Sequence, residues 1–517
     1  MPRSMARVAG ALSASRVART TGSRAPASRH YVILPGAVLA LALPWLWMFD
    51  SLLQATILTA QLLLCACGIV SSYVTGLRPM RMVFFVFTLS WLGVGPLYQI
   101  SHRALAWNDS GLLNDTDRVT AALALTLLAT TSTALAMWLG GRRRARRADL
   151  PEPAPVRSVR PRSWTPWGYL GLLGVLTPYV VLTNGGVGTF FSSRADRVED
   201  LTQAGVTLES SGGLQVAVAS ILPAALAVVA AHLFIWRIRE ARAAGGWMHA
   251  SLSDAAGLVV SLGAVVLYAN PISNTRFLSL AAFGSIALAM VRPRGRTAGR
   301  GLTLGLLVAT LGIYPLSNAL ASDTGTQLGG SASPLTVFAS KDFDGFQQVV
   351  NTFIYVEDHG YSLGSYISSA LFFFVPRSLW TTKATPASID VAENRDYWFT
   401  NLSLPVHAEF YLEFGIIGML LLTFAMGLLW SRIDEAWLRH PGSMGAWLAP
   451  FLCLAQLGLI RGPLGSLSPI WLTVTVLLLV GVTRQAASVT GNRPDVMTQR
   501  DGSPGLASPV PVNSSAT

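Results

Sequence analysis

Charged side chains are scarce in this chain of 517 residues: Asp, Glu, Lys and Arg make up 12% of it, whereas 51% is hydrophobic. Soluble globular proteins carry about 25% charged residues, so roughly half of the expected charge is missing. The mean hydropathy of +0.47 excludes an ordinary soluble enzyme. Apolar spans of about 20 residues, the length that crosses a bilayer, are the better unit for interpreting the sequence.

Lysine and cysteine are nearly absent as well. Lys341 and Lys383 are the two lysines, so arginine supplies almost all of the positive charge behind the net +12. These arginines stand in short runs between apolar segments, which indicates membrane topology and not a nucleic-acid partner. The three cysteines, Cys65, Cys67 and Cys453, lie in apolar segments, so they offer neither a disulfide framework nor a metal site.

Motifs for nucleotides and metals are also lacking. The chain has no nucleotide-binding glycine loop and no H-x-x-x-H, C-x-x-C or EF-hand spacing. Asp342 and Asp344 form a D-x-D pair, a weak signal that the solvation of a charged loop explains equally well. We therefore predict neither a cofactor nor a metal.

What the chain does have is a series of apolar stretches. Twelve of them are candidate transmembrane helices: 31–49, 51–74, 82–100, 119–140, 167–183, 214–236, 253–270, 276–292, 301–318, 413–430, 445–460 and 469–483. We expect an all-α polytopic membrane protein with about 12 transmembrane helices, nine within 31–318 and three within 413–484. A large loop, 319–412, separates helices 9 and 10, and we expect it to form a mostly non-helical cap. Its apolar segment 365–376 is too short to cross and is predicted to be re-entrant or interfacial.

The distribution of charge predicts the orientation. If the N-terminus lies inside, inside segments hold 28 of the 38 Lys and Arg, and outside segments hold 18 of the 26 acids. Both termini are then cytoplasmic, and the basic tail 1–30, the tail 485–517 and the Pro/Arg-rich segment 141–165 are expected to be disordered. The loops 184–213 and 319–412 are extracytoplasmic, so any chemistry is expected on the outer face.

Three arginines stand at the predicted outer boundary of the membrane. Arg377 follows an apolar run directly, Arg276 opens the eighth span, and Arg461 ends the eleventh. A guanidinium binds phosphate oxygens bidentately and keeps its charge when desolvated, which suits a lipid-linked phosphate or diphosphate. The alternative is an arginine that ends a helix or extends to the lipid interface.

Two patterns in residues 375–418 are more specific. The first is P-R-x-x-W-x-x-K at Pro376, Arg377, Trp380 and Lys383. The second is N-x-S-x-P-x-x-x-E-x-x-x-x-F-G-x-x-G, which runs from Asn401 through Glu409 to Gly418. This region resembles the oligosaccharide repeat-unit polymerases, the Wzy-type O-antigen polymerase family. Fainter similarities lie at 185–197, which contains Arg194, at Asp344, and at 461–466, which begins with Arg461.

The resemblance implies a membrane glycosyltransferase of the bacterial plasma membrane. Such proteins transfer a growing glycan from one undecaprenyl diphosphate carrier to a second lipid-linked repeat unit on the outer face, and so build a cell-surface polysaccharide. The partners it implies are these lipid-linked donor and acceptor glycans, membrane lipids, a chain-length co-polymerase and a flippase.

The transfer needs a cation for the diphosphate and a base for the acceptor hydroxyl. Arg377 is the first candidate for the diphosphate, assisted by Arg276 and Lys383. Glu409 is the candidate general base, with Asp344 second and His407 as a rival. His407 and Glu409 are two positions apart, so they share a face on a strand but not on a helix.

Further residues are candidates for binding the substrate. Trp380, Tyr397, Trp398, Phe399 and Tyr411 are aromatic residues close to these charges, so they are candidates for stacking on sugar rings or for an interfacial belt. Asn401, Arg194 and Arg461 complete the predicted set.

Other functions remain open on this sequence. A ligase that moves a finished glycan to another acceptor would need much the same site. A flippase or transporter of lipid-linked glycans would be expected to show paired repeats and charged or broken helices at mid-membrane, and few charges lie inside these spans. A non-catalytic scaffold for envelope assembly is a third class.

Overall fold

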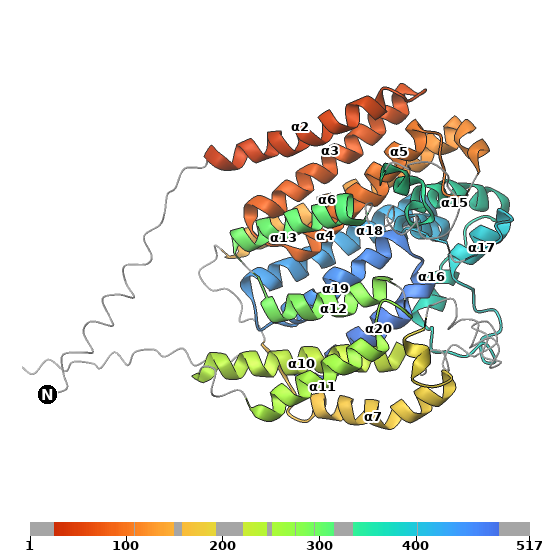
Figure 1. Ribbon diagram of the computed structural model, residues 1–517. Coiled ribbons are helices and arrows are strands. Elements are labelled where there is room, and N and C mark those ends of the chain that lie inside the picture. Colours follow the sequence, from red (N-terminus) through yellow and green to blue (C-terminus); the bar gives the residue numbers. More distant parts are fainter. Residues whose placement is uncertain are drawn as a thin grey trace, which may run out of the picture.

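A computed structural model describes residues 25–107, 109–148, 158–192, 221–245, 251–274, 276–293, 295–314, 334–400 and 402–484. The described chain is a bundle of helices whose long axes run roughly side by side, with shorter helices gathered at one end (Figure 1). The predicted tail 485–517, most of the loop 184–213 and most of the tail 1–30 lie outside the described residues.

Each of the twelve predicted apolar stretches coincides with a helix. The helices are α2 (Ala25–Leu46), α3 (Leu52–Thr75), α4 (Pro79–Leu89) continued by a π-turn and α5 (Gly95–Ser101), α6 (Thr116–Ala148), α7 (Thr165–Thr183), α10 (Leu222–Gly245), α11 (Leu252–Tyr268), α12 (Arg276–Val291), α13 (Arg296–Val308), α18 (Val406–Arg439), α19 (Met444–Arg461) and α20 (Leu464–Val480). Seven described helices are long and apolar enough to cross a membrane. Four more are apolar but shorter. The fold is thus that of a helical membrane protein, and the count of 12 spans stays a prediction.

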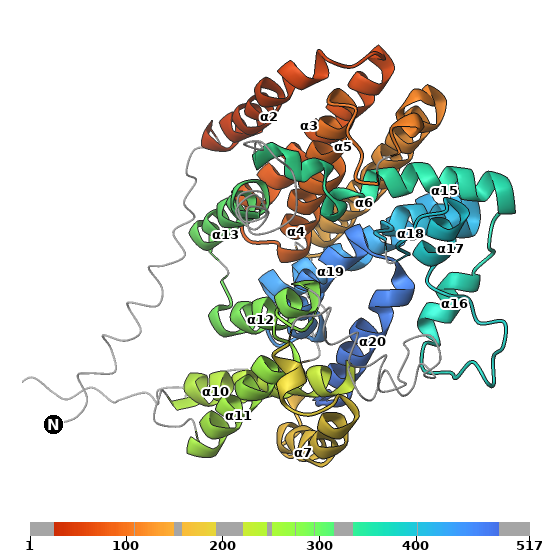
Figure 2. The same cartoon turned by 45° about the vertical axis from the view of Figure 1, so that its right-hand side comes forward.

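The bundle has two hydrophobic cores. The larger one joins α3, α4, α6, α15 (Gly345–His359) and α18, and the smaller one joins α7, α10, α11, α12 and α20. Figure 2 shows α2, α3 and α6 on one side and α7, α10 and α11 on the other. α19 contributes side chains to both cores, so it connects the two halves.

A glycine allows α6 and α18 to pack closely. α6 and α18 pack along much of their length, and at Gly427 a Cβ atom would lie 2.5 Å from the carbonyl oxygen of Thr133. Any side chain at Gly427 would therefore push α18 away from α6, because real Cβ atoms do not approach backbone so closely.

The end of the bundle formed by residues 334–400 is largely helical, which corrects the expectation of a non-helical cap. It contains two 3₁₀ turns, Pro334–Ala339 and Lys341–Phe343, and the helices α15 (Gly345–His359), α16 (Ser365–Leu371) and α17 (Ala387–Asn394). In Figure 1 these helices lie together at the end of the bundle away from the start of α2. We call this region the cap. The predicted re-entrant segment 365–376 begins as α16, which packs against α20.

Three further segments differ from the sequence prediction. α18 begins at Val406, not at 413, so its first turns belong to the predicted loop. In the segment 141–165, α6 continues to Ala148, and strand β1 (Val159–Pro161) pairs antiparallel with β2 (Val482–Arg484). α2 likewise includes residues 25–30 of the predicted tail.

Contacts between loops agree with the predicted alternation of sides. At the cap end, Arg103 pairs with Asp50 at 2.9 Å and Arg395 with Asp109 at 2.6 Å. At the opposite end, Arg160 pairs with Glu240 at 2.6 Å. Each pair joins two residues assigned to the same side of the membrane by the charge count. Which end faces the cytoplasm stays a prediction.

Candidate functional site

Asp344 is a buried acid at the start of α15. Its side chain is 1% exposed, and its Oδ2 atom accepts from the indole Nε1 of Trp107 at 2.9 Å and from the backbone N of Ser403 at 3.4 Å. Its other oxygen, Oδ1, has no hydrogen-bond partner among the described residues. A buried carboxylate oxygen without a donor is costly, so this atom is available to a ligand or a proton.

Arg461, the last residue of α19, lies beside this acid. Its Nε donates to Ser403 Oγ at 3.1 Å, and its Nη2 pairs with Asp342 Oδ1 at 3.0 Å. Ser403 therefore contacts Arg461 through its hydroxyl and Asp344 through its backbone N. We call Asp344, Trp107, Ser403 and Arg461 the Asp344 site.

Burial and charge act in opposite directions on Asp344. Loss of solvent raises the pKa of its carboxyl group above the ordinary value, and the nearby Arg461 charge and the donors Ser403 and Trp107 offset only part of that shift. A raised pKa makes this carboxylate a better proton acceptor near neutral pH.

Aromatic rings lie over this site. The ring of Trp107 is nearly parallel to those of Tyr397 and Phe399, with centroids 5.7 and 5.8 Å away. The Lys341 ammonium lies 4.7 Å from the Trp107 ring centroid and 4.4 Å from that of Trp398. Trp398 is 79% exposed, so one face of this aromatic cluster is open to a ligand.

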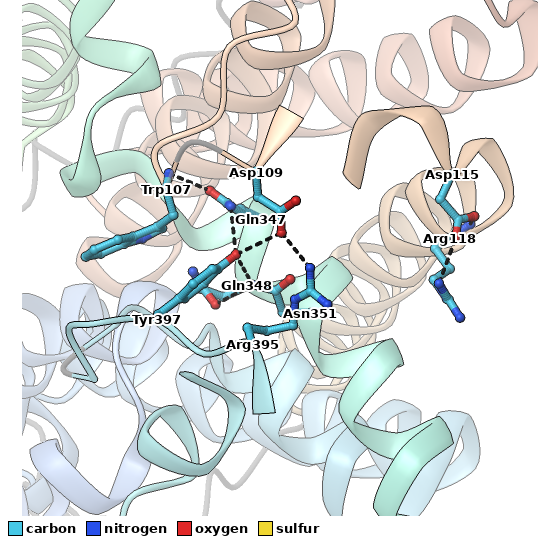
Figure 3. A network of polar contacts seen from close by, with 9 residues as sticks. All are labelled: Trp107, Asp109, Asp115, Arg118, Gln347, Gln348, Asn351, Arg395 and Tyr397. Carbon is cyan, nitrogen blue, oxygen red and sulfur yellow. Dashed lines mark hydrogen bonds and ion pairs between the residues drawn. The ribbon is translucent and has the colours of Figure 1, made fainter. Parts of the chain in front are cut away.

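A partly buried polar network fixes the aromatic cluster (Figure 3). The Tyr397 hydroxyl accepts from Gln347 Nε2 at 3.0 Å and from Asn351 Nδ2 at 3.2 Å, and it donates to Asp109 at 3.3 Å. Asp109 also pairs with Arg395. Gln347 in turn accepts from the backbone N of Trp107 at 3.1 Å.

Most residues of this network were not predicted from the sequence. Trp107 and Asp109 come from the loop before α6, far from the motif region in sequence. One signal was present: Gln347, Gln348 and Asn351 recur at helical spacing on α15, where they are all fully buried. Amides on the inner face of a helix need buried partners, so such spacing indicates a polar network in the core.

Glu409, the predicted base, lies on the first turn of α18 and is completely buried. Its Oε2 accepts from the backbone N of Leu464 at 2.7 Å, at the first residue of α20. The first N–H groups of a helix have no acceptor within the helix, and Glu409 supplies one for α20. Its negative charge also interacts favourably with the positive end of the α20 dipole. Its Oε1 has no partner in the described part of the chain.

Glu413, one turn later, uses both of its oxygens. Oε1 accepts from the backbone N of Ile367 at 2.7 Å, and Oε2 accepts from the backbone N of Gly364 and from Ser362 Oγ at 3.1 Å. The acid therefore caps α16. No sequence pattern predicted this role, because Glu413 opens what was expected to be a membrane span.

α18 is broken immediately after this acid. Gly415 adopts φ 66° and ψ −165°, a conformation that favours glycine. The carbonyls of Leu412 and Glu413 instead accept from the backbone N atoms of Ser362 and Leu363, both at 3.1 Å. The F-G motif thus marks a helix break.

The helical start of α18 separates His407 from Glu409. His407 is buried against α6, with its Nε2 3.2 Å from Thr126 Oγ1, whereas Glu409 points to α20. Tyr411 packs against Phe353, with ring centroids 4.6 Å apart, and is 7% exposed. The three motif residues therefore point to three different surroundings.

The motif P-R-x-x-W-x-x-K lies in a turn of residues 372–383, which follows α16 and which we call the clasp. The Lys383 ammonium donates to the carbonyls of Phe372, Phe373 and Val375 at 3.2, 2.7 and 2.9 Å. Its three donors are thereby used to hold the turn, and its assistance at a diphosphate stays a prediction. Partial burial, and secondarily the charge of Arg377, lower the pKa of Lys383.

Arg377 remains exposed on this clasp. One of its nitrogens, Nη1, donates to the carbonyl of Lys383 at 2.7 Å, and its other nitrogens make no hydrogen bond to the described residues. Phe374 and Leu379 beside it are 50% and 81% exposed. Trp380 donates to Thr382 Oγ1 at 3.2 Å.

The predicted residues thus fall into separate groups. Asp344 joins Arg461, and Arg377 joins Lys383, but no hydrogen bond or ion pair within the described ranges joins Arg377 to Asp344 or Glu409. Arg194, Asn401 and the side chain of Arg276 lie outside the described residues. Arg276 begins α12, and the next residue, Phe277, has its ring centroid 5.0 Å from the Arg461 guanidinium carbon.

No group of three or more His, Cys, Asp or Glu side chains suited to a metal occurs among the described residues. No family model, curated protein or solved structure matches the chain. What the site can do chemically therefore follows from its own geometry. It offers a proton acceptor, a cation beside it and an open aromatic surface, a combination suited to a sugar hydroxyl and an anionic leaving group.

Proposed function

We propose that the protein is a membrane glycosyltransferase that polymerises undecaprenyl-diphosphate-linked repeat units into a polysaccharide on the outer face of the bacterial plasma membrane. The observation that carries this proposal is the Asp344 site: a buried carboxylate with one unpartnered oxygen, next to Arg461 and an open aromatic cluster. The two motif patterns at 375–418 support the same function.

The reaction assigns a role to each part of the site. A hydroxyl of the acceptor glycan attacks the anomeric carbon of the donor, the bond from that carbon to the diphosphate oxygen breaks, and Asp344 takes the hydroxyl proton. Arg461 is the cation whose charge acts on the proposed base, so we assign it to stabilise the charge that develops on the leaving diphosphate. The exposed aromatic surface of Trp398 would hold the sugar rings.

Arg377 fits an earlier step better. It lies on the clasp beside the exposed apolar side chains of Phe374 and Leu379. Arg377 would bind the diphosphate while these two side chains contact the lipid tail. We therefore assign it to capture of the lipid-linked substrate. Glu409 remains the alternative base, since it too has an unpartnered oxygen, but no cation in the described part of the chain pairs with it, and its other oxygen holds the start of α20.

The test is complementation of a deletion strain with wild type, Asp344→Asn, Arg461→Gln or Arg377→Gln, with lipid-linked glycans resolved by size. Glu393→Gln is the matched control, since this acid is exposed on the same cap. Loss of the polymer ladder, with single repeat units accumulating on the outer leaflet, is expected for the site variants only.

Other outcomes would reject polymerisation. Repeat units retained on the cytoplasmic leaflet would identify a flippase. Normal polymer that stays on its lipid carrier would identify a ligase. A normal ladder in all three site variants would remove the proposed site.

A further inference from the structure

Lys341 is a cation that lies over the aromatic cluster of the cap. Its ammonium is 4.7 Å from the ring centroid of Trp107 and 4.4 Å from that of Trp398. Among the described residues no acid pairs with this ammonium and no oxygen accepts from it. Aromatic faces attract a cation but supply no negative charge, and an ammonium has three N–H donors. Lys341 can therefore bind an anion that a ligand brings.

The other cations of this region have partners. Arg461 pairs with Asp342 at 3.0 Å. Lys383, the second lysine of the chain, donates to three backbone carbonyls of the clasp. Lys341 thus differs from both, since the described chain gives its ammonium only the faces of two indole rings.

Trp107 connects Lys341 to the proposed base. Its indole Nε1 donates to Asp344 at 2.9 Å, and its ring lies beside the ammonium. The second ring beside the ammonium, that of Trp398, is 79% exposed and can stack on a sugar. A group that meets the ammonium is therefore a substituent of the sugar bound on these rings, whereas the leaving diphosphate is assigned to Arg461.

We propose that Lys341 binds the carboxylate of an acidic sugar, so that the substrate of this site is a glycan containing a uronic acid or a similar anionic residue. An ammonium and a carboxylate form a charge-assisted hydrogen bond, and the adjoining ring face contacts the apolar face of the same sugar. The inference rests on the proposed function for its glycan substrate and adds the chemical class of that glycan.

The test measures binding without turnover, using the full-length protein purified in neutral detergent. Trigalacturonic acid, its methyl ester and inorganic pyrophosphate are titrated separately by calorimetry. Lys341→Met removes the charge and keeps much of the apolar stem, and Lys341→Arg keeps the charge. Because Lys341 is exposed, neither change is expected to impair folding. Arg118→Gln is the matched control, since it removes a cation that pairs with Glu357 of the cap, apart from the aromatic cluster (Figure 3).

We expect wild type to bind the acid at least about fivefold more tightly than its methyl ester. Lys341→Met should abolish this preference, whereas Lys341→Arg and Arg118→Gln should keep it. The absence of a preference in wild type, or its persistence in Lys341→Met, would overturn the proposal. Weaker binding of pyrophosphate alone by Lys341→Met would also overturn it, in favour of a role at the leaving group.

This result is separate from the test of polymerisation. The titration involves no glycosyl transfer, so a negative result removes the acidic sugar and leaves the complementation test undecided by it. Conversely, a normal polymer ladder in the site variants would reject the proposed reaction and leave the measured preference for the acid unchanged.

Discussion

The start of α18 and the start of α15 both carry buried carboxylates, but the two regions use them differently. At α18, Glu413 caps α16 with both oxygens, and Glu409 accepts from the first residue of α20. At α15, Asp344 accepts hydrogen bonds from the Trp107 indole and the Ser403 backbone N. It lies beside Arg461 and the exposed surface of Trp398. The first region connects helices of the cap to the bundle. The second is arranged to receive a ligand.

This difference shows that burial alone does not identify a catalytic acid. All three carboxylates are at most 1% exposed. What distinguishes Asp344 is its neighbours, which are groups that can also contact a substrate. The two roles can be distinguished by replacing each carboxylate. Replacing a catalytic acid should lower activity, whereas replacing a structural acid should lower stability.

The largest effect is expected for Asp344→Asn. Asparagine keeps an oxygen for Trp107 and Ser403 but cannot accept the proton, so polymer synthesis should fall by about 10²- to 10⁴-fold. The unfolding temperature should change little. Polymer ladders and thermal unfolding of the purified variant measure the two quantities, and substantial polymer from this variant would show that Asp344 is not the base.

Glu413→Ala should mainly lower stability, whereas Asp344→Asn should mainly lower activity. It leaves the backbone N atoms of Gly364 and Ile367 without their acceptor, so we expect a loss of roughly 3 kcal/mol in the free energy of unfolding. Thermal unfolding and the yield of folded protein are the measurements. Ser365→Ala is the control, since it changes the same short helix and leaves the carboxylate in place. An unchanged unfolding temperature would mean that Glu413 does not hold α16.

The raised pKa of Asp344 predicts a dependence on pH. Because the folded state holds this proton more tightly than the unfolded state, the carboxyl group contributes stability at low pH. That contribution is lost as pH rises from the ordinary value of 3.8 through the raised pKa. The difference in unfolding temperature between wild type and Asp344→Asn should therefore vary with pH in this window, whereas the rate of polymer synthesis by wild type should rise. A constant difference would contradict the assignment.

Lys383→Met should lower the free energy of local unfolding of the clasp by about 1 kcal/mol. Methionine keeps much of the apolar stem but leaves the carbonyls of Phe372, Phe373 and Val375 without their donor. Faster proteolysis within 372–383 is the expected result. Lys341→Met is the control, because that lysine lies over the aromatic cluster and not in the clasp.

The sequence predicted the fold and part of the site, for reasons that these residues illustrate. Hydropathy located the helices because a span must be apolar along its whole length. It could not locate the start of α18, since the polar first turns are buried by the cap and not by lipid. Asp344 and Arg461 were predicted as single residues, but their contact through Ser403 depends on how α19 meets the cap.

Side chains that contact each other across the cap were harder to predict. Trp107 and Asp109 are more than 200 positions from α15 in the sequence, and no local pattern connects them to Gln347. Lys383 was expected at a diphosphate because its charge is evident from the sequence, whereas its carbonyl partners are evident only from the fold. Charge can be read from a sequence, whereas the groups that satisfy it depend on the fold.

The smallest effect, and the one that decides between the two candidate bases, is expected for Glu409→Gln. Glutamine retains an oxygen that can accept from Leu464, so the loss of stability should be below about 1 kcal/mol. Glu409→Ala removes that acceptor and should destabilise more, because the first N–H of α20 is then buried without a partner. If Glu409 only holds α20, the glutamine variant makes a normal polymer ladder and the alanine variant makes less. If Glu409 is the base, both variants lose the polymer alike, and the catalytic role passes from Asp344 to the start of α18.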